Sequence, residues 1–168
     1  MDTPLIAGVR AILAEAEADI AARRPICRSS GRCCKFEAYG HRMYVTAAEA
    51  VYFQATHVQE IATDGDRREA AAVALPQFFS QEKPEGCPYQ LGGLCTAREA
   101  RPLGCRVYFC DENAQGWQAE VYEKYHAMLK ALHEATGLPY RYIEWREALR
   151  EMRYGNEHPR GLFIPDRE

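Results

Sequence analysis

Residues 114–139 read AQGWQAEVYEKYHAMLKALHEATGLP, and the apolar side chains of this stretch recur at the spacing of one helix face. Gly137 and Pro139 follow as a helix stop, because glycine suits the left-handed position after a helix and proline cannot continue one. We therefore predict a long helix from Ala114 to Ala135, with an apolar face made of Trp117, Val121, Tyr125, Met128, Leu129 and Leu132. A face of this length needs other elements to pack against it, which favours a mainly α-helical fold.

Further helix signals occur on both sides of this stretch. Thr3 followed by Pro4 is typical of a helix start, and Thr46 with Glu49 forms a capping box. From such signals we expect helices over residues 4–24, 46–63, 66–80 and 144–153. The segment from Phe36 to Val45 predicts a short strand or hairpin, and residues 82–113, rich in glycine and proline, predict a loop.

The length and composition of the chain limit the class of protein. A chain of 168 residues that is 47% hydrophobic can form one compact domain, so we expect a single mainly α domain over residues 1–168. It would comprise a cysteine-bearing region at about 27–110 and a C-terminal helical segment at about 114–153. The net charge of -3 argues against a nucleic-acid partner. Since no signal peptide or long apolar run is found, we expect a cytoplasmic protein without a membrane partner.

Seven cysteines are the feature that a functional interpretation must explain. They form two groups in irregular segments, with Cys27, Cys33 and Cys34 in the first and Cys87, Cys95, Cys105 and Cys110 in the second. Thiolates that converge on a metal would stabilise such segments. Disulfides are disfavoured by the odd number and by a reducing compartment, although any single cysteine can be a small buried apolar residue. The pattern therefore predicts a metal site with these seven side chains as candidate ligands.

The cysteines occur in a specific order with other short motifs. These motifs are Cys27-Arg-Ser-Ser30-Gly-Arg-Cys33-Cys34, Val45-Thr46-x-x-Glu49, Cys87-Pro88-Tyr89, Cys95 and Arg101-Pro102-x-x-Cys105-Arg106. The arrangement resembles the CxxCxxCC cysteine-cluster family, also called YkgJ-like, which is described as zinc- or iron-chelating. The resemblance spans residues 27–110 and implies a metal, often an iron-sulfur cluster, in a bacterial cytoplasmic protein. The family pattern has a cysteine where this chain has Ser30, and Cys110 is a candidate replacement.

The number and spacing of the thiols bear on the identity of the metal. A zinc ion or a [4Fe-4S] cluster takes four thiolates, so seven cysteines exceed one site and fall short of two. Zinc ribbons present closely spaced pairs, and only Cys105 and Cys110 approach that spacing. A cluster accepts ligands from more dispersed loops. We therefore expect an iron-sulfur cluster, in its simplest form [4Fe-4S], with zinc or mononuclear iron as alternatives.

The ligand assignment begins with the second group. Cys87, Cys95 and Cys105 lie in the part of the chain that best matches the family pattern, and their loop can wrap one centre. We expect the fourth ligand to be Cys33 or Cys34 but not both, because neighbours in an extended segment point to opposite faces. The reserve ligands are Cys27 and Cys110.

Charged and ring side chains near the cysteines were also considered as parts of the site. Arg101 and Arg106 flank Cys105, and we expect both to stabilise a negatively charged thiolate-bound centre as cofactor-binding residues. His41 is a further candidate ligand. His126 and His133 are two helical turns apart, too far to share an ion, and are expected on a solvated or partly packed face.

The sequence leaves the activity open between three classes of protein. An electron-transfer or redox-sensing protein with an unidentified redox or binding partner is the first hypothesis. The alternatives are a structural zinc module that mediates protein interaction, and a small metalloenzyme with an open metal position and an unknown substrate.

Overall fold

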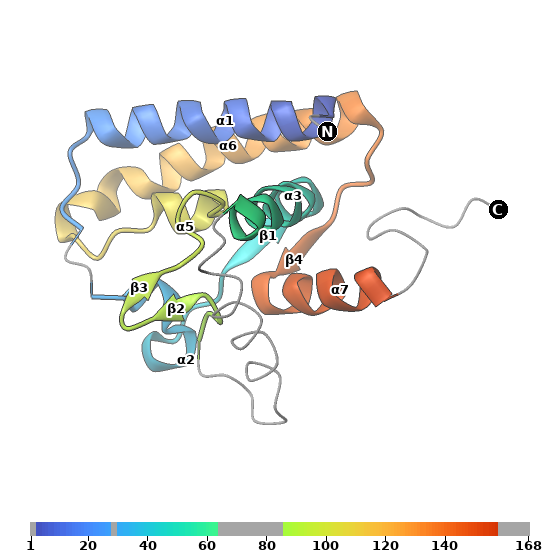
Figure 1. The fold of residues 1–168 in the computed structure, drawn as a ribbon. Coiled ribbons are helices and arrows are strands. Elements are labelled where there is room, and N and C mark those ends of the chain that lie inside the picture. The colour runs from blue at the N-terminus through green and yellow to red at the C-terminus, as the bar shows by residue number, and fades with distance from the viewer. Residues whose placement is uncertain (1–2, 28–29, 64–85, 158–168) are drawn as a thin grey trace.

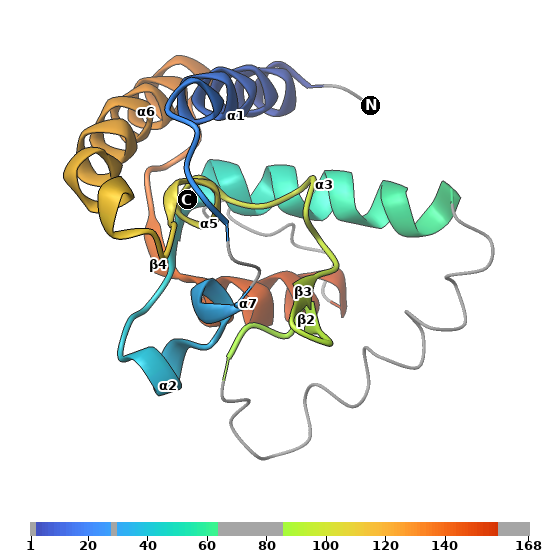
Figure 2. The same cartoon turned by 90° about the vertical axis from the view of Figure 1, so that its left-hand side faces the viewer.

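The computed structural model describes residues 3–27, 30–63 and 86–157, and over these residues it is mainly helical, as expected. Two long helices, α1 (Pro4–Ala22) and α6 (Gln115–Thr136), lie side by side along the top of the molecule in Figure 1. Helix α3 (Ala47–Thr63) lies between this pair and α7 (Trp145–Glu157), as Figure 2 shows. The helix expected over residues 66–80 lies outside the described residues.

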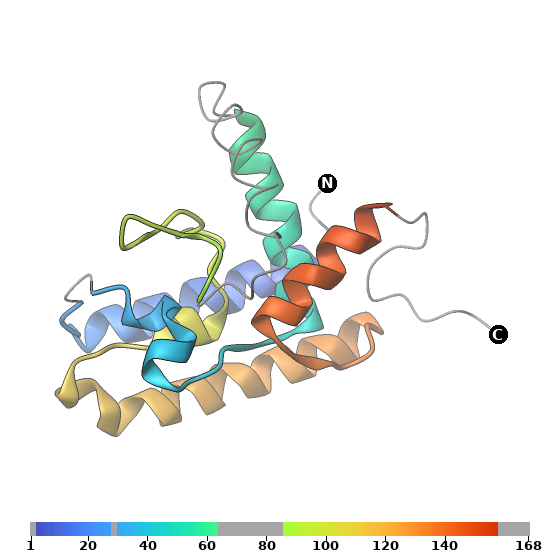
Figure 3. The same cartoon turned by 90° about the horizontal axis from the view of Figure 1, so that it is seen from below.

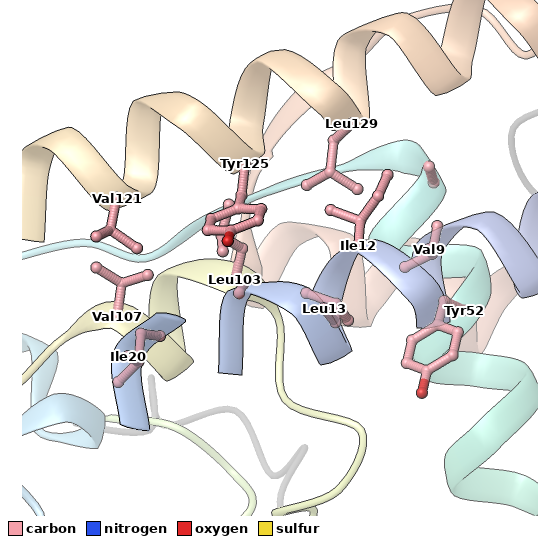
Figure 4. Packing of buried hydrophobic residues seen from close by; sticks show 12 residues of the cluster. Val9, Ile12, Leu13, Ile20, Tyr52, Leu103, Val107, Val121, Tyr125 and Leu129 are labelled. Carbon is pink, nitrogen blue, oxygen red and sulfur yellow. The ribbon is translucent and has the colours of Figure 1, made fainter. Parts of the chain in front are cut away.

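Helices α1 and α6 begin and end where their capping residues predict. The Thr3 hydroxyl accepts a hydrogen bond from the Ile6 amide at 3.3 Å, and Gly137 takes the left-handed conformation after α6. Close packing of the pair depends on Gly8, because a Cβ there would come within 2.6 Å of the Leu132 side chain. The predicted apolar face of α6 is confirmed in part: Val121, Tyr125 and Leu129 are buried against α1, α3 and α5 (Leu103–Val107) (Figure 4).

The predicted capping box at the start of α3 is confirmed and does more than cap one helix. The Thr46 amide and hydroxyl donate to Glu49 Oε2 at 2.8 and 2.9 Å, and the Glu49 amide donates to the Thr46 hydroxyl at 3.3 Å. Glu49 Oε1 also accepts from the Leu103 amide at 2.8 Å. The buried Glu49 carboxylate, whose pKa burial raises, thereby fixes the start of α5 to the start of α3.

A two-stranded antiparallel sheet joins distant parts of the chain. Strand β1 (Tyr44–Thr46) pairs with β4 (Tyr142–Glu144), with Val45 opposite Ile143. The expectation for Phe36 to Val45 is therefore partly wrong, since it begins with a short helix, α2 (Phe36–Tyr39), and contains no local hairpin. A partner about a hundred residues away leaves no signal in the local pattern.

The expectation of plain loop over residues 82–113 is wrong for the described residues 86–113. Strands β2 (Gln90–Leu91) and β3 (Leu94–Cys95) form a hairpin, and α5 follows. Gly92 and Gly93 connect the strands with φ of 57° and 85°. Positive φ at both central residues is the requirement of a tight two-residue hairpin turn. The hairpin, α2 and α5 lie at one end of the molecule (Figures 1 and 3).

A second group of buried apolar residues packs against the cysteine-bearing segments. It includes Phe36, Val45, Phe53 and Trp145, and partly buried Cys87, Tyr89, Cys95 and Cys105 pack against it. In the part of the chain that the structure describes, no helix combines the length and the apolar character needed to cross a membrane.

Candidate metal centre

Backbone contacts hold the two cysteine segments against each other. The Cys87 amide donates to the Cys34 carbonyl at 2.7 Å, and the Gln90 side-chain amide donates to the Gly31 carbonyl at 2.9 Å. Gly86 makes the first contact possible, because any Cβ at this position would collide with the Cys34 carbonyl. The two groups of cysteines, far apart in the sequence, are thus adjacent in the fold.

All seven cysteines line one cavity of about 400 Å³, which we call the cysteine cavity. They belong to different local structures: the segment after α1, the 3₁₀ turn η1 (Arg32–Cys34), the β2–β3 hairpin and the residues just before it, α5, and the segment after α5. In chain order they are Cys27, Cys33, Cys34, Cys87, Cys95, Cys105 and Cys110. None forms a disulfide.

The neighbouring Cys33 and Cys34 point into the same cavity. Their sulfur atoms are 3.8 Å apart, so the expectation that they face opposite ways is wrong. The reason is local: η1 is a tight helical turn, whereas the expectation assumed an extended segment. A hydrogen bond from Cys34, helped by the charge of Arg101, lowers the pKa of Cys33 to about 6. The same hydrogen bond raises the pKa of Cys34.

The second group extends the row of sulfur atoms. The neighbouring Cys34 thiol lowers the pKa of Cys87. The indole N–H of Trp145 contributes to the lower pKa, yet this buried group has no hydrogen-bond partner of ordinary geometry in the described part of the chain. Burial raises the pKa of Cys95 and Cys105. The cavity is therefore lined both by thiols whose pKa is lowered and by thiols whose pKa is raised.

Ser30 and Cys110 lie together at the edge of the cavity. The Ser30 hydroxyl oxygen is 3.4 Å from the Cys110 sulfur. Cys110 therefore occupies the place beside Ser30 at which a replacement thiol is expected. Cys27, by contrast, is exposed at the rim.

Arg106 serves mainly to hold the chain around the site. Its guanidinium donates to Glu17 at 2.7 Å, to the Arg101 carbonyl at 2.8 Å and to the Glu99 carbonyl. These contacts tie α5 to α1 and to the segment that precedes α5. The described contacts therefore assign Arg106 a structural role, although it also borders the cavity.

Arg101 and Arg98 are the arginines whose charges reach the thiols. The charges of Arg101 and Arg98 help to lower the pKa of Cys33, and Arg101 offsets part of the increase that burial causes in the pKa of Cys95 and Cys105. Arg101 lines the cysteine cavity, and its expected contact with a bound centre stays a prediction. Arg98 was not expected there, since nothing in the local sequence distinguishes it from a surface arginine.

The three histidines that the sequence singles out lie outside the cysteine cavity. His41 is not among its lining residues; it stacks on Tyr108 and its Nε2 lies 3.4 Å from the Cys33 carbonyl. His126 and His133 are buried, so of the two expected surroundings the solvated face is wrong and the packed one is closer to the structure. His133 accepts from the Ala48 amide at 3.3 Å and joins α6 to the start of α3.

The seven thiols line one cavity, but they are not arranged as the ligands of a single metal ion. Among the described residues, no group of three or more His, Cys, Asp or Glu side chains is arranged to hold a metal ion. The arrangement supplies soft donors from two segments, positive charge from arginine and a buried N–H donor. These are the components by which proteins bind and tune thiolate-ligated metals.

No family model, curated protein or solved structure matches this chain. The chemistry of the site therefore has to be argued from its own residues.

Proposed function

We propose that the cysteine cavity binds a thiolate-ligated metal centre, first of all an iron-sulfur cluster of the [4Fe-4S] type, and that the protein transfers electrons or senses redox state. The observation that carries this proposal is the convergence of all seven cysteines on one cavity. Two segments that are irregular in sequence are brought together with their thiols facing inward. A set of seven unpaired thiols in one place has no comparable explanation in packing alone.

The surroundings of the thiols fit a negatively charged centre. A cluster supplies one-electron chemistry when it is bound, and its potential depends on burial, charge and hydrogen bonds to sulfur. Arg101 provides positive charge, and the buried Trp145 N–H, which has no hydrogen-bond partner among the described residues, helps to lower the pKa of Cys87. Both features would stabilise the more negative, reduced state.

The proposed ligand set keeps the assignment that the resemblance to the family pattern implies, and all of its members line the cavity. Cys87, Cys95 and Cys105 are the first three ligands, and one of Cys33 and Cys34 is the fourth. A cluster takes one cysteine on each iron, so two sulfur atoms 3.8 Å apart cannot both bind it without moving. The resemblance to the CxxCxxCC family adds to this proposal and awaits the same experiment.

A single tetrahedral ion is the second candidate. With Zn–S bonds of about 2.3 Å, two thiolates on one tetrahedral ion lie about 3.8 Å apart. The sulfur atoms of Cys33 and Cys34 have this separation. Zinc would make the protein a structural module for a binding partner, and mononuclear iron or zinc with an open position would make it a small metalloenzyme.

Chemical analysis of anaerobically purified protein tests the proposal. Iron and acid-labile sulfide in equal amounts, with a brown colour, would support the cluster, whereas zinc without sulfide would support the second candidate. The Cys95→Ala and Cys105→Ala variants should lose most of the metal, while Cys27→Ala, at the exposed rim, should keep it. Protein that contains neither metal, also after anaerobic reconstitution, would refute both.

A further inference from the structure

The cysteine cavity is larger than a metal ion needs. Its volume of about 400 Å³ falls within the range of sites for small organic molecules, about 300–1,000 Å³. Residues that a metal does not require line part of it. Among the described residues these include the arginines Arg24, Arg98, Arg101 and Arg106 and the aromatic residues Tyr108 and Phe109.

The charges around the cavity do not balance. Glu17 is the one carboxylate among the described lining residues, and Arg106 holds it at 2.7 Å. Arg24, Arg98 and Arg101 then leave three positive charges. A zinc ion or an oxidised [4Fe-4S] core with four thiolates, Cys33 among them, would carry two negative charges, so one positive charge remains around a loaded centre.

Arg101 is placed to use this charge on a ligand. Its side chain is only 19% exposed, and its Nε donates to the Arg98 carbonyl at 2.9 Å, which fixes the guanidinium. The nearest carboxylate oxygen, on Glu17, is 4.0 Å from its terminal nitrogen. A fixed guanidinium with terminal N–H groups available is suited to bidentate binding of a carboxylate.

We propose that the cysteine cavity also binds a small monoanionic organic acid, its carboxylate held by Arg101 and Arg98 and its apolar body packed on the aromatic wall of Tyr108 and Phe109. A monoanion matches the single positive charge that a loaded centre leaves. The apolar wall favours an organic body over a bare inorganic anion. This site goes beyond the metal centre, because the arginines attract a carboxylate with or without the metal.

Benzoate and its neutral analogue benzamide test the site, with binding followed by calorimetry on the full chain as purified. We expect benzoate to bind at least about tenfold more tightly than benzamide. A hydrogen bond between charged groups contributes more binding free energy than a tenfold change in affinity requires. Arg101→Gln should weaken benzoate binding about tenfold and leave benzamide unaffected. Arg150→Gln, which removes the same charge from an exposed site on α7, should change neither.

Arg98→Gln keeps the test decisive if Arg101→Gln disturbs folding. Arg98 is exposed, so its loss should weaken benzoate binding in a folded protein. Metal content, measured on each sample, separates this site from the metal centre. Equal affinity for benzoate and benzamide, unchanged benzoate binding in both variants, or inorganic phosphate bound as tightly as benzoate would overturn the proposal.

Discussion

At the residue scale, the contact between Ser30 and Cys110 brings a hydroxyl and a thiol to one edge of the proposed centre. The serine oxygen and the cysteine sulfur are 3.4 Å apart, although the residues lie in different segments. A thiol at either position could therefore reach nearly the same point. Serine oxygen is a harder and more weakly binding ligand than thiolate for zinc and for iron-sulfur clusters.

Because Cys110 is a reserve ligand beside the four proposed ones, we predict that Cys110→Ser lowers the metal content of the protein only in part and that adding Ser30→Cys restores it. The double variant moves the thiol by one contact distance and keeps the number of cysteines unchanged. Metal per chain, measured by plasma emission after anaerobic reconstitution, checks this. If Cys110→Ser retains all of its metal, Cys110 has no part in the centre.

Gly86 offers a second test at this scale, because its missing Cβ allows Cys87 to hydrogen-bond Cys34. We expect Gly86→Ala to destabilise the protein by about 1–3 kcal/mol through overpacking and to weaken metal binding. Gly116, in the first turn of α6 with open space around it, is the matched control. Gly116→Ala should raise stability by up to about 1 kcal/mol. Urea unfolding compares the two, and equal effects would contradict the role of Gly86.

Residue identity could be predicted for the site, but orientation could not. The cysteines were found by type and spacing, and Arg101 by its place in a motif. Arg106 was expected to face the centre, yet its partner Glu17 comes from a helix about ninety residues earlier. The shared direction of Cys33 and Cys34 depends on a 3₁₀ turn whose backbone no side-chain pattern specifies.

At the element scale, helices with caps were predictable and short elements were not. Helices α1, α3 and α6 follow from caps and from apolar spacing that the sequence displays. The β2–β3 hairpin has strands of two residues, too short for an alternating pattern, and α5 has only five. Such elements are held by the contacts around them, as Glu49 holds the start of α5.

The buried position of Leu129 makes α6 testable. Leu129 lies on α6 and is fully buried in the first apolar cluster. Leu129→Ala should therefore destabilise the protein by about 2–5 kcal/mol through lost contacts and a cavity. Glu134, exposed one turn later on α6, is the control, and Glu134→Ala should stay within about 0.5 kcal/mol. Thermal and urea unfolding measure both. Similar small effects would show that α6 packs differently.

At the scale of the whole molecule, the apolar core and the cysteines occupy different regions. One buried cluster, in which the paired helices α1 and α6 supply most residues, contains no cysteine. The second cluster has cysteines packed along its border. The long helices therefore have their own source of stability, whereas the segments around the cavity depend on a few hydrogen bonds and on any bound metal.

Removal of the metal should therefore loosen one end of the molecule and spare the other. We expect faster hydrogen exchange over residues 27–46 and 86–113 after chelation, with little change in α1 and α6. Exchange followed by mass spectrometry on loaded and metal-free protein gives this comparison. Unchanged exchange around the cavity after complete metal removal would contradict the coupling.

We propose above all that the cysteine cavity holds a metal centre bound by thiolates from four of its seven cysteines. X-ray absorption at the metal edge of the anaerobically purified protein tests this proposal most directly, because the spectrum counts the atoms bound to the metal. We predict a first shell made of sulfur at about 2.3 Å, accompanied by iron–iron scattering if the centre is a cluster. A first shell of oxygen and nitrogen, or a protein that binds no metal with its thiols reduced, would contradict it.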